Sequence, residues 1–184
     1  MRLTEPRVNP LDEAEVEGEG VELLERVRRS DGVGRIFRTL VRHPKLMKRW
    51  MVFGNHILAK STLPPREREI LILRIGWLCK AEYEFSAHLR IGREAGLSEE
   101  EIERIKAGPD APGWSPFDAA LLRATDELHA DAFVCDATWN ELSERYDTQQ
   151  MMDVVFTVGQ YNLLGMALNS LGVQPETPVP DFPR

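Results

Sequence analysis

The chain has 184 residues, of which 42% are hydrophobic and 29% charged, and 23 Lys and Arg against 30 Asp and Glu give a net charge of −7. This length suits one domain with a substantial core, and the apolar fraction is too high for a disordered chain. The acidic total argues against general nucleic-acid binding, which depends on a positive surface facing the phosphates.

Compartment and membrane association follow from the same reading. Two cysteines, Cys79 and Cys135, do not make a disulfide framework, so we expect a reducing compartment. Residues 1–20 are polar and acidic and contain no apolar signal core. The longest apolar stretch, residues 151–168, contains Asp153, Gln160 and Asn162, which is not typical of a membrane span. The sequence therefore predicts a cytoplasmic protein that binds neither membranes nor nucleic acid.

Two tails flank the region of regular structure. Residues 1–18 contain two prolines and a run of acids with no helical or strand period. Residues 174–184 contain four prolines, which forbid a helix and favour an extended chain, either loose or laid over a neighbouring surface. We therefore predict an acidic N-terminal tail over 1–18, one domain over 19–173 and a Pro-rich C-terminal tail over 174–184.

Only helices are predicted between the tails. No segment alternates strictly between apolar and polar residues, and no Asn-Gly or Asp-Gly hairpin signal occurs. Helix starts are marked by a capping box of Ser98 and Glu101, by Ser115 before a proline, and by Asp136 and Asp147 as caps. The predicted helices span residues 19–30, 34–42, 44–60, 65–79, 81–95, 98–106, 115–131, 136–146 and 148–171. The expected fold class is all-α, a single-domain helical bundle.

The charge is unevenly distributed. Residues 26–49 contain nine Lys and Arg and one acid, Asp31. Such a run either faces an anionic ligand or partner, or forms the solvated faces of two or three helices. The acids on both sides of the run favour the solvated interpretation.

The predicted helix over 65–79 carries one unusual carboxylate. From Ile70 to Leu78 large apolar residues cover nearly every side, which is typical of a helix buried in the middle of its fold. Glu69 lies on the same stripe as Ile72 and Gly76. In a dry setting this carboxylate would hold or pass a proton. The alternative is an exposed first-turn acid stabilised by the helix dipole.

The next predicted helix, over 81–95, brings an acid and an imidazole together. Glu84 and His88 are four residues apart and share a face that is otherwise small or apolar. The carboxylate can orient the ring and stabilise its cation, so the two form a workable proton-transfer pair. Small neighbours such as Gly92 would leave room for a ligand. The alternative is a buried histidine satisfied by its neighbouring glutamate, without chemistry.

Other candidates are weaker. Asp126 and His129 have the spacing used in carboxylate-bridged di-metal bundles, but such a site needs a second pair and two further acids, so no metal site is predicted. Cys79 and Cys135 lack a CxxC spacing and are expected to pack as small hydrophobic residues.

The last predicted helix carries two asparagines, Asn162 and Asn169, on one face. They either line a pocket or bond across helices, and the pattern leaves both open. No Gly-rich phosphate loop occurs in the chain.

Three segments together resemble the core motif of the carboxymuconolactone decarboxylase and alkylhydroperoxidase D superfamily. They are REREILILR, CKAEYEFSAH and LRIGREAGLSEEEIERI, and the resemblance is strong over residues 44–108. It continues loosely to a closing element with these residues: Tyr161, Asn162, Asn169, Gly172 and Val173. The family glutamate falls on Glu69 and the motif histidine on His88. The resemblance implies an all-helical, alkylhydroperoxidase D-like fold whose subunits form trimers, or trimer pairs as hexamers.

The chain departs from the peroxidase branch of that superfamily. In that branch a CxxC pair precedes the histidine, and the matching positions here are Ala81 and Glu84. Cys79, two residues early, does not replace a disulfide pair. A thiol peroxidase needs an attacking and a resolving thiol, so peroxidase activity is not expected.

The decarboxylase branch needs no thiol, cofactor or metal. Loss of CO₂ from an unsaturated lactone acid leaves an enolate that must be stabilised and protonated. The resemblance implies His88 as the general acid, with Glu84 orienting it and Glu69 holding or passing a proton. Tyr83 matches a relay histidine of some peroxidases and is a binding candidate, together with Asn162. The expected substrate is a small anionic cyclic or unsaturated carbonyl compound; the alternatives are a residual thiol enzyme and a non-catalytic helical oligomer.

Overall fold

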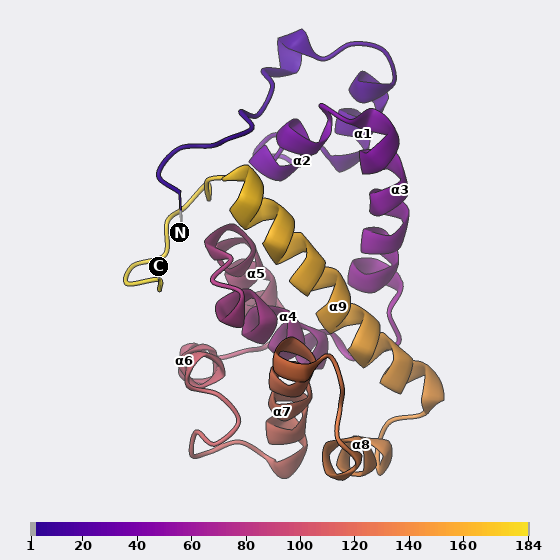
Figure 1. Ribbon diagram of the computed structural model, residues 1–184, viewed down its shortest axis with the longest axis vertical. Coiled ribbons are helices and arrows are strands. Elements are labelled where there is room, and N and C mark those ends of the chain that lie inside the picture. The colour runs from indigo at the N-terminus through magenta and orange to yellow at the C-terminus, as the bar shows by residue number, and fades with distance from the viewer. Residues whose placement is uncertain (1–2, 184) are drawn as a thin grey trace.

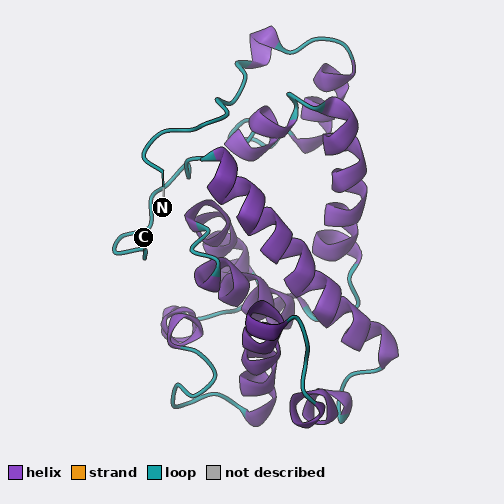
Figure 2. Ribbon diagram, viewed as in Figure 1, coloured by secondary structure: helices purple, strands orange, loops and turns teal. Residues whose placement is uncertain are grey.

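The computed structural model describes residues 3–183, and its regular elements within that range are all helices, with one isolated bridge between Arg29 and Gly32 (Figure 2). The α-helices are α1 (Glu19–Val27), α2 (Arg35–Leu40), α3 (Pro44–Asn55), α4 (Pro65–Leu78), α5 (Glu82–Glu94), α6 (Glu99–Ala107), α7 (Pro116–Asp131), α8 (Asp136–Ser143) and α9 (Thr148–Leu171). A 3₁₀ turn, η1 (Glu13–Glu15), and a π-helical turn, η2 (His56–Lys60), complete the set. The predicted all-α fold class is confirmed.

Element boundaries differ from expectation by three residues or more in three places. The predicted helix over 44–60 divides into α3 and η2. α1 ends at Val27, because the chain turns extended at Arg28 and a tight turn brings Arg29 to Gly32, whose φ is +104°. α8 ends at Ser143, earlier than predicted. The long helices α4 and α9 agree with their predicted spans to within a residue.

Three of the predicted capping signals are confirmed at helix starts. Ser98 and Glu101 form the expected box, and Ser115 accepts from the Asp118 backbone N–H at 3.1 Å. Asp147 caps α9 in a box with Gln150. The prediction for Asp136 is wrong, since Cys135 is the N-cap of α8 and Asp136 is the first helical residue.

α4 is the central helix of the molecule. It packs against α5, α6, α7 and α9, and every residue from Glu69 to Gly76 is buried. α5 follows it after the three residues 79–81, of which Lys80 has φ +52°. α9 runs diagonally across the molecule, with α1–α3 on one side and α7 on the other (Figure 1). A second, smaller apolar cluster joins α1, α2 and α3: Leu23, Leu24, Val33, Val41 and Met47.

The two ends of the described chain lie side by side (Figure 1). The N-terminal segment bonds to the end of α9, where the Arg7 backbone N–H donates to Leu171 O at 2.9 Å. The C-terminal segment crosses α5, where Ser86 Oγ donates to Thr177 O at 2.6 Å and Phe182 packs on Phe85. The Pro-rich segment therefore covers part of its own chain.

Among the helices of residues 3–183, not one is long and apolar enough to span a bilayer.

Candidate active site

Glu69, Glu84 and His88 meet in the interior between α4 and α5. His88 Nδ1 lies 2.6 Å from Glu69 Oε2, and His88 Nε2 lies 3.0 Å from Glu84 Oε1. Glu69 is 0% exposed, and Glu84 and His88 are each 4% exposed. The alternative of a solvent-facing Glu69 is therefore wrong. Because carboxylates only accept, both ring nitrogens donate, which is the arrangement of an imidazolium.

Two further residues complete the cluster. Arg68 donates to the other oxygen of the central carboxylate, with Nε 3.2 Å and Nη2 3.1 Å from Glu69 Oε1. The ring of Tyr161, on α9, packs edge-on against the His88 ring with 5.0 Å between centroids. Two carboxylates are thus balanced by a guanidinium and an imidazolium, which is the condition under which charges can be buried.

The carboxylates set the protonation of the ring. Burial lowers the pKa of His88, but the hydrogen bonds and charges of Glu69 and Glu84 outweigh that effect and raise it from 6.5 to about 9. Burial and the charges of the same glutamates raise the pKa of Tyr161 well above its ordinary value, so its hydroxyl stays protonated. At neutral pH the cluster therefore contains a dry, charged proton donor.

Close packing of α4 on α5 produces this contact. A Cβ at Gly92, one turn after His88, would lie 3.1 Å from Leu97 Cδ1 and 3.2 Å from Leu73 Cδ1. The space at Gly92 is therefore filled by neighbouring leucines, and the expectation that it leaves room for a ligand is wrong. Because Gly92 has no side chain, α5 can approach α4 at the level of Glu69. A Cβ at Gly92 would lie 3.9 Å from the Cβ of Glu69.

The remaining charged residues of α4 bind other helices. Arg74 donates to both carboxylate oxygens of Asp126 on α7, at 2.6 and 2.8 Å. Arg66 pairs with Asp118 and Glu101. Buried Glu67 accepts from Arg145 and from the hydroxyl of Tyr146. These pairs join α4 to its neighbours, and only Arg68 and Glu69 contact the histidine cluster.

The two residues predicted to bind substrate lie outside this cluster. The Tyr83 hydroxyl lies 3.3 Å from the Ile36 backbone N–H, whose hydrogen bond it accepts, and 3.3 Å from a carboxylate oxygen of Glu176 in the C-terminal segment. Asn162 Oδ1 accepts from Cys79 Sγ at 3.0 Å. Asn169 Nδ2 donates to Cys79 O at 2.8 Å, so both asparagines bond across helices. Neither Tyr83 nor Asn162 makes a hydrogen bond to the cluster among residues 3–183.

The thiols and the Asp126–His129 pair are also apart from the cluster. Cys79 and Cys135 are not joined by a disulfide in the described chain, and Cys79 Sγ lies 3.8 Å from His129 Nδ1. Cys135 Sγ donates to Glu127 at 3.2 Å. Within the described range, no group of three or more His, Cys, Asp or Glu is arranged to hold a metal ion.

A surface cavity of about 620 Å³ lies directly beside the cluster. Its half-buried floor is formed by Leu58, Arg68 and Ile91, and its exposed rim by these residues: Arg29, Ser30, Asp31, Arg90 and Glu94. Arg68 is shared between the cavity and Glu69, and Ile91 follows His88 by three residues on α5. Arg68 thus lies between the cavity and the cluster and contacts both.

Sequence reasoning identified the three central residues but missed Arg68 and Tyr161. Arg68 precedes Glu69 in the segment REREI, but the apolar periodicity that singles out Glu69 does not single out Arg68. Tyr161 was noted only as part of the closing family element. No local pattern places either beside His88, because they come from three different helices.

Comparison with known proteins shows which family and which solved structures the chain resembles. Residues 44–127 match the model of the Carboxymuconolactone decarboxylase family, and no curated protein matches the chain. A peroxidase-related protein of Ralstonia eutropha JMP134 with an alkylhydroperoxidase AhpD core has a TM-score of 0.81 at 18% identity, covering 93% of this chain and 92% of that one. A peroxidase-related protein from Silicibacter sp. TM1040 has a TM-score of 0.78 at 16% identity, with 98% and 97% covered.

The debrominase Bmp8, solved in complex with 2,3,4-tribromopyrrole, has a TM-score of 0.75 at 13% identity, with 95% of this chain and 94% of that one covered. At these identities the likeness establishes an AhpD-like helical fold and nothing finer. The segment that matches the model of the Carboxymuconolactone decarboxylase family, residues 44–127, includes Glu69, Glu84 and His88.

Proposed function

We propose that this protein is a cofactor-independent acid–base enzyme of the carboxymuconolactone decarboxylase type. The observation that carries the proposal is the buried His88 imidazolium held between two carboxylates, 2.6 Å from Glu69 and 3.0 Å from Glu84. A charged ring in a dry site is protonated at neutral pH and can donate its proton to a carbanion or enolate that forms beside it. The substrate class is a small anionic cyclic or unsaturated carbonyl compound.

The reaction then divides into two steps. The bond between the substrate's carboxylate and its ring breaks, CO₂ leaves, and the electron pair passes into the conjugated carbonyl system as an enolate. His88 donates a proton to the enolate, and the imidazole ring of His88 becomes neutral. Glu69 holds Nδ1, which leaves Nε2, on the Glu84 side, as the nitrogen that delivers the proton. Isomerisation or hydrolysis by the same groups would need the same donor.

A peroxidase cycle is not supported. The positions that match the CxxC pair of the peroxidase branch hold Ala81 and Glu84, and the cysteine nearest to them in sequence, Cys79, bonds to Asn162. Two thiols are needed for attack and resolution. One observation favours a non-catalytic relative instead: His88 is only 4% exposed and both its nitrogens are paired.

The test is decarboxylation of 4-carboxymuconolactone, measured as CO₂ release. We expect turnover in the wild type and a loss of at least about 100-fold in kcat in His88→Ala, since general acids contribute on the order of 10²–10⁴. His129→Ala removes a histidine outside the cluster and should retain full kcat. Equal kcat in His88→Ala and wild type, with both folded by circular dichroism, would eliminate the acid–base proposal. Absence of turnover in the wild type would favour the non-catalytic oligomer.

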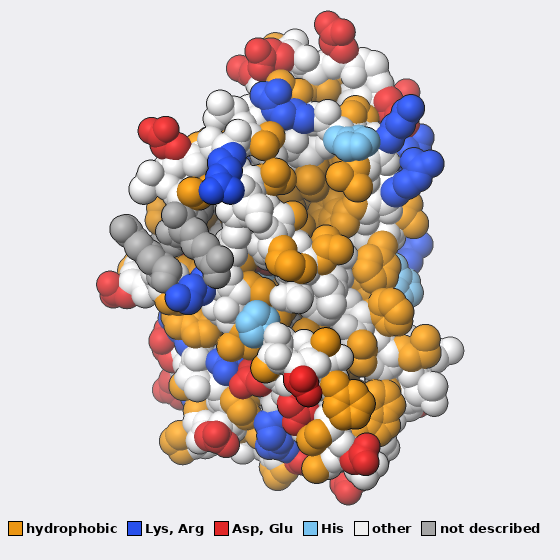
Figure 3. Space-filling model, in the orientation of Figure 1, with side chains coloured by type: hydrophobic (Ala, Val, Ile, Leu, Met, Phe, Trp, Pro, Cys, Tyr) orange, Lys and Arg blue, Asp and Glu red, His pale blue; other side chains and the backbone are white. Residues whose placement is uncertain are grey.

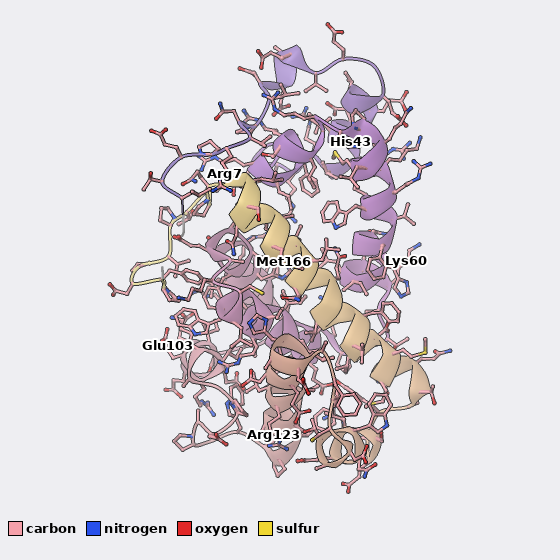
Figure 4. All side chains as sticks on the ribbon, in the orientation of Figure 1. Arg7, His43, Lys60, Glu103, Arg123 and Met166 are labelled. Carbon is pink, nitrogen blue, oxygen red and sulfur yellow. The ribbon has the colours of Figure 1, made fainter. Side chains whose placement is uncertain are left out.

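We also propose that the chain forms a homo-oligomer, a trimer or a hexamer of paired trimers. α9 carries a stripe of exposed apolar residues that continues onto α3, where Phe53 contacts Phe156 with 6.0 Å between ring centroids. This α3–α9 face consists of Val52, Phe53, Met152, Phe156, Leu163 and Met166, each at least 37% exposed. Figure 3 shows hydrophobic side chains gathered along it, and Figure 4 labels Met166 on α9. A contiguous apolar surface of this kind is typical of a subunit interface.

A further inference from the structure

The cavity beside the histidine cluster is built from segments distant in the chain. The loop between α1 and α2 supplies Arg29, Ser30 and Asp31, and η2 supplies Leu58. α4 and α5 supply the rest of the lining. Its volume of about 620 Å³ lies within the range of roughly 300–1,000 Å³ typical of sites for small molecules. The apolar floor residues Leu58 and Ile91 would contact the body of a ligand.

The lining contains three arginines and two acids, whereas the whole chain has a net charge of −7. Arg90 and Glu94 neutralise each other at 2.7 Å. The charge of Arg68 is balanced by Glu69 beneath the floor, and Arg29 lies on the same rim as Asp31. Anion binding at this cavity therefore depends on the hydrogen-bond donors that Arg29 and Arg68 have to spare and not on a net positive charge.

Arg29 is a free cation within a basic stretch whose other members are mostly engaged. Arg28 pairs with Glu13 and Glu25, and Lys48 pairs with Glu19. Elsewhere in the run, Arg38 and Arg42 donate to backbone carbonyls of the N-terminal segment. Within the described chain the Arg29 side chain makes no hydrogen bond or ion pair, and it lies on the rim of the cavity.

Arg68 has donor capacity left for a ligand. Its Nε and Nη2 bind Glu69 Oε1, while its Nη1 makes no hydrogen bond in the part of the chain that the structure describes. The side chain is 11% exposed and forms part of the cavity floor. A carboxylate entering the cavity would therefore meet a guanidinium whose other edge already contacts the cluster. Guanidinium–carboxylate contacts are strong and directional.

We propose that this cavity binds the carboxylate of a small organic acid through Arg68 and Arg29, and that it is the entrance to the Glu69–His88–Glu84 cluster. The proposal rests on the proposed function and adds to it the residues that bind the substrate's carboxylate and the route of access. The part of the basic stretch that acts on a ligand is then Arg29, while the neighbouring cations stabilise the fold.

The experiment measures binding of an inert probe, benzoate, by isothermal titration calorimetry, with benzamide as its uncharged counterpart. We expect benzoate to bind at least about tenfold more tightly than benzamide, and Arg29→Gln to weaken benzoate about tenfold, the range of a charge-assisted contact. The matched control is Arg26→Gln, which removes an equal charge from an exposed α1 residue outside the cavity. It should leave benzoate affinity unchanged. Benzoate should also shift the His88 ring resonances in NMR spectra.

Three results would overturn the proposal: no saturable benzoate binding, equal affinity for benzoate and benzamide, or equal weakening by Arg29→Gln and Arg26→Gln. Because benzoate is not turned over, its binding is independent of decarboxylation, and we expect it to persist in His88→Ala. Binding without turnover would discard the proposed function alone. Turnover of the lactone acid with no Arg29 effect on benzoate would discard this inference alone.

Discussion

His88 illustrates how a buried charge is stabilised at the scale of single residues. Taking an ion out of water costs several kcal/mol unless partners replace the solvent. Here Glu69 and Glu84 each accept from one ring nitrogen, and Arg68 balances the second negative charge. The same contacts that stabilise the imidazolium also hold its orientation, which is what a positioned acid requires.

This arrangement predicts a pH dependence of stability. The pKa of His88 rises from 6.5 to about 9 on folding, so the stabilisation is complete below pH 6.5 and is lost as the pH rises through 9. We expect the free energy of unfolding in urea to fall by on the order of 3 kcal/mol over that window. His88→Gln should lack this decline. Parallel pH profiles of the two proteins would show that His88 does not titrate as described.

At the scale of elements, the site depends on the hairpin of α4 and α5. α4 is buried on every side, so its polar residues must find partners on the helices around it. Four of them, Arg66, Glu67, Arg74 and Glu69, contact α5, α6, α7 or the chain around α8. The turn at Lys80 reverses the chain, and Gly92 permits the close approach that brings His88 onto Glu69.

A glycine-to-alanine substitution tests that approach. In an open helix this change stabilises by about 1 kcal/mol, because alanine is the better helix former. Gly92→Ala should instead lower the free energy of unfolding by about 1–2 kcal/mol, since Leu73 and Leu97 are buried and cannot move aside freely. A Gly92→Ala variant at least as stable as the wild type in urea titrations would contradict the packing argument.

At the scale of the whole molecule, the exposed apolar surface is concentrated rather than scattered. The two most apolar helices differ in this respect: α4 is enclosed by its own chain, while α9 exposes Met152, Phe156, Leu163 and Met166. The Pro-rich C-terminal segment packs on α5 rather than on this α3–α9 face.

The proposed oligomer predicts a mass of three or six chains by light scattering at micromolar concentration. Leu163→Glu places a charge in the α3–α9 face and should shift the protein towards monomer, because burying an unpaired carboxylate is unfavourable. Phe133→Glu changes a residue that is 60% exposed outside this face and should leave the mass unchanged. A monomeric wild type would refute the proposal, and an assembly indifferent to Leu163→Glu would place the interface elsewhere.

Local signals in the sequence were sufficient for the helices and for part of the site. The capping box at Ser98, the burial of α4 and the pairing of Glu84 with His88 all follow from neighbours within one or two turns. Glu69 was singled out by the apolar stripe of its own helix, and only the family resemblance joined it to His88, since a contact across 19 residues has no local pattern. The N-cap of α8 and the partners of Tyr83 and Asn162 escaped prediction.

By itself, then, the sequence determined the all-α class, the central position of α4 and the candidate histidine with its helical neighbour. Only the tertiary structure decided that Arg68 turns to Glu69, that Tyr161 packs on His88, and that Arg29 and Arg68 line one cavity. The physical reason is distance along the chain. Helical periodicity depends on residues three or four positions apart, whereas the partner of a buried charge depends on which helices pack together and exclude water.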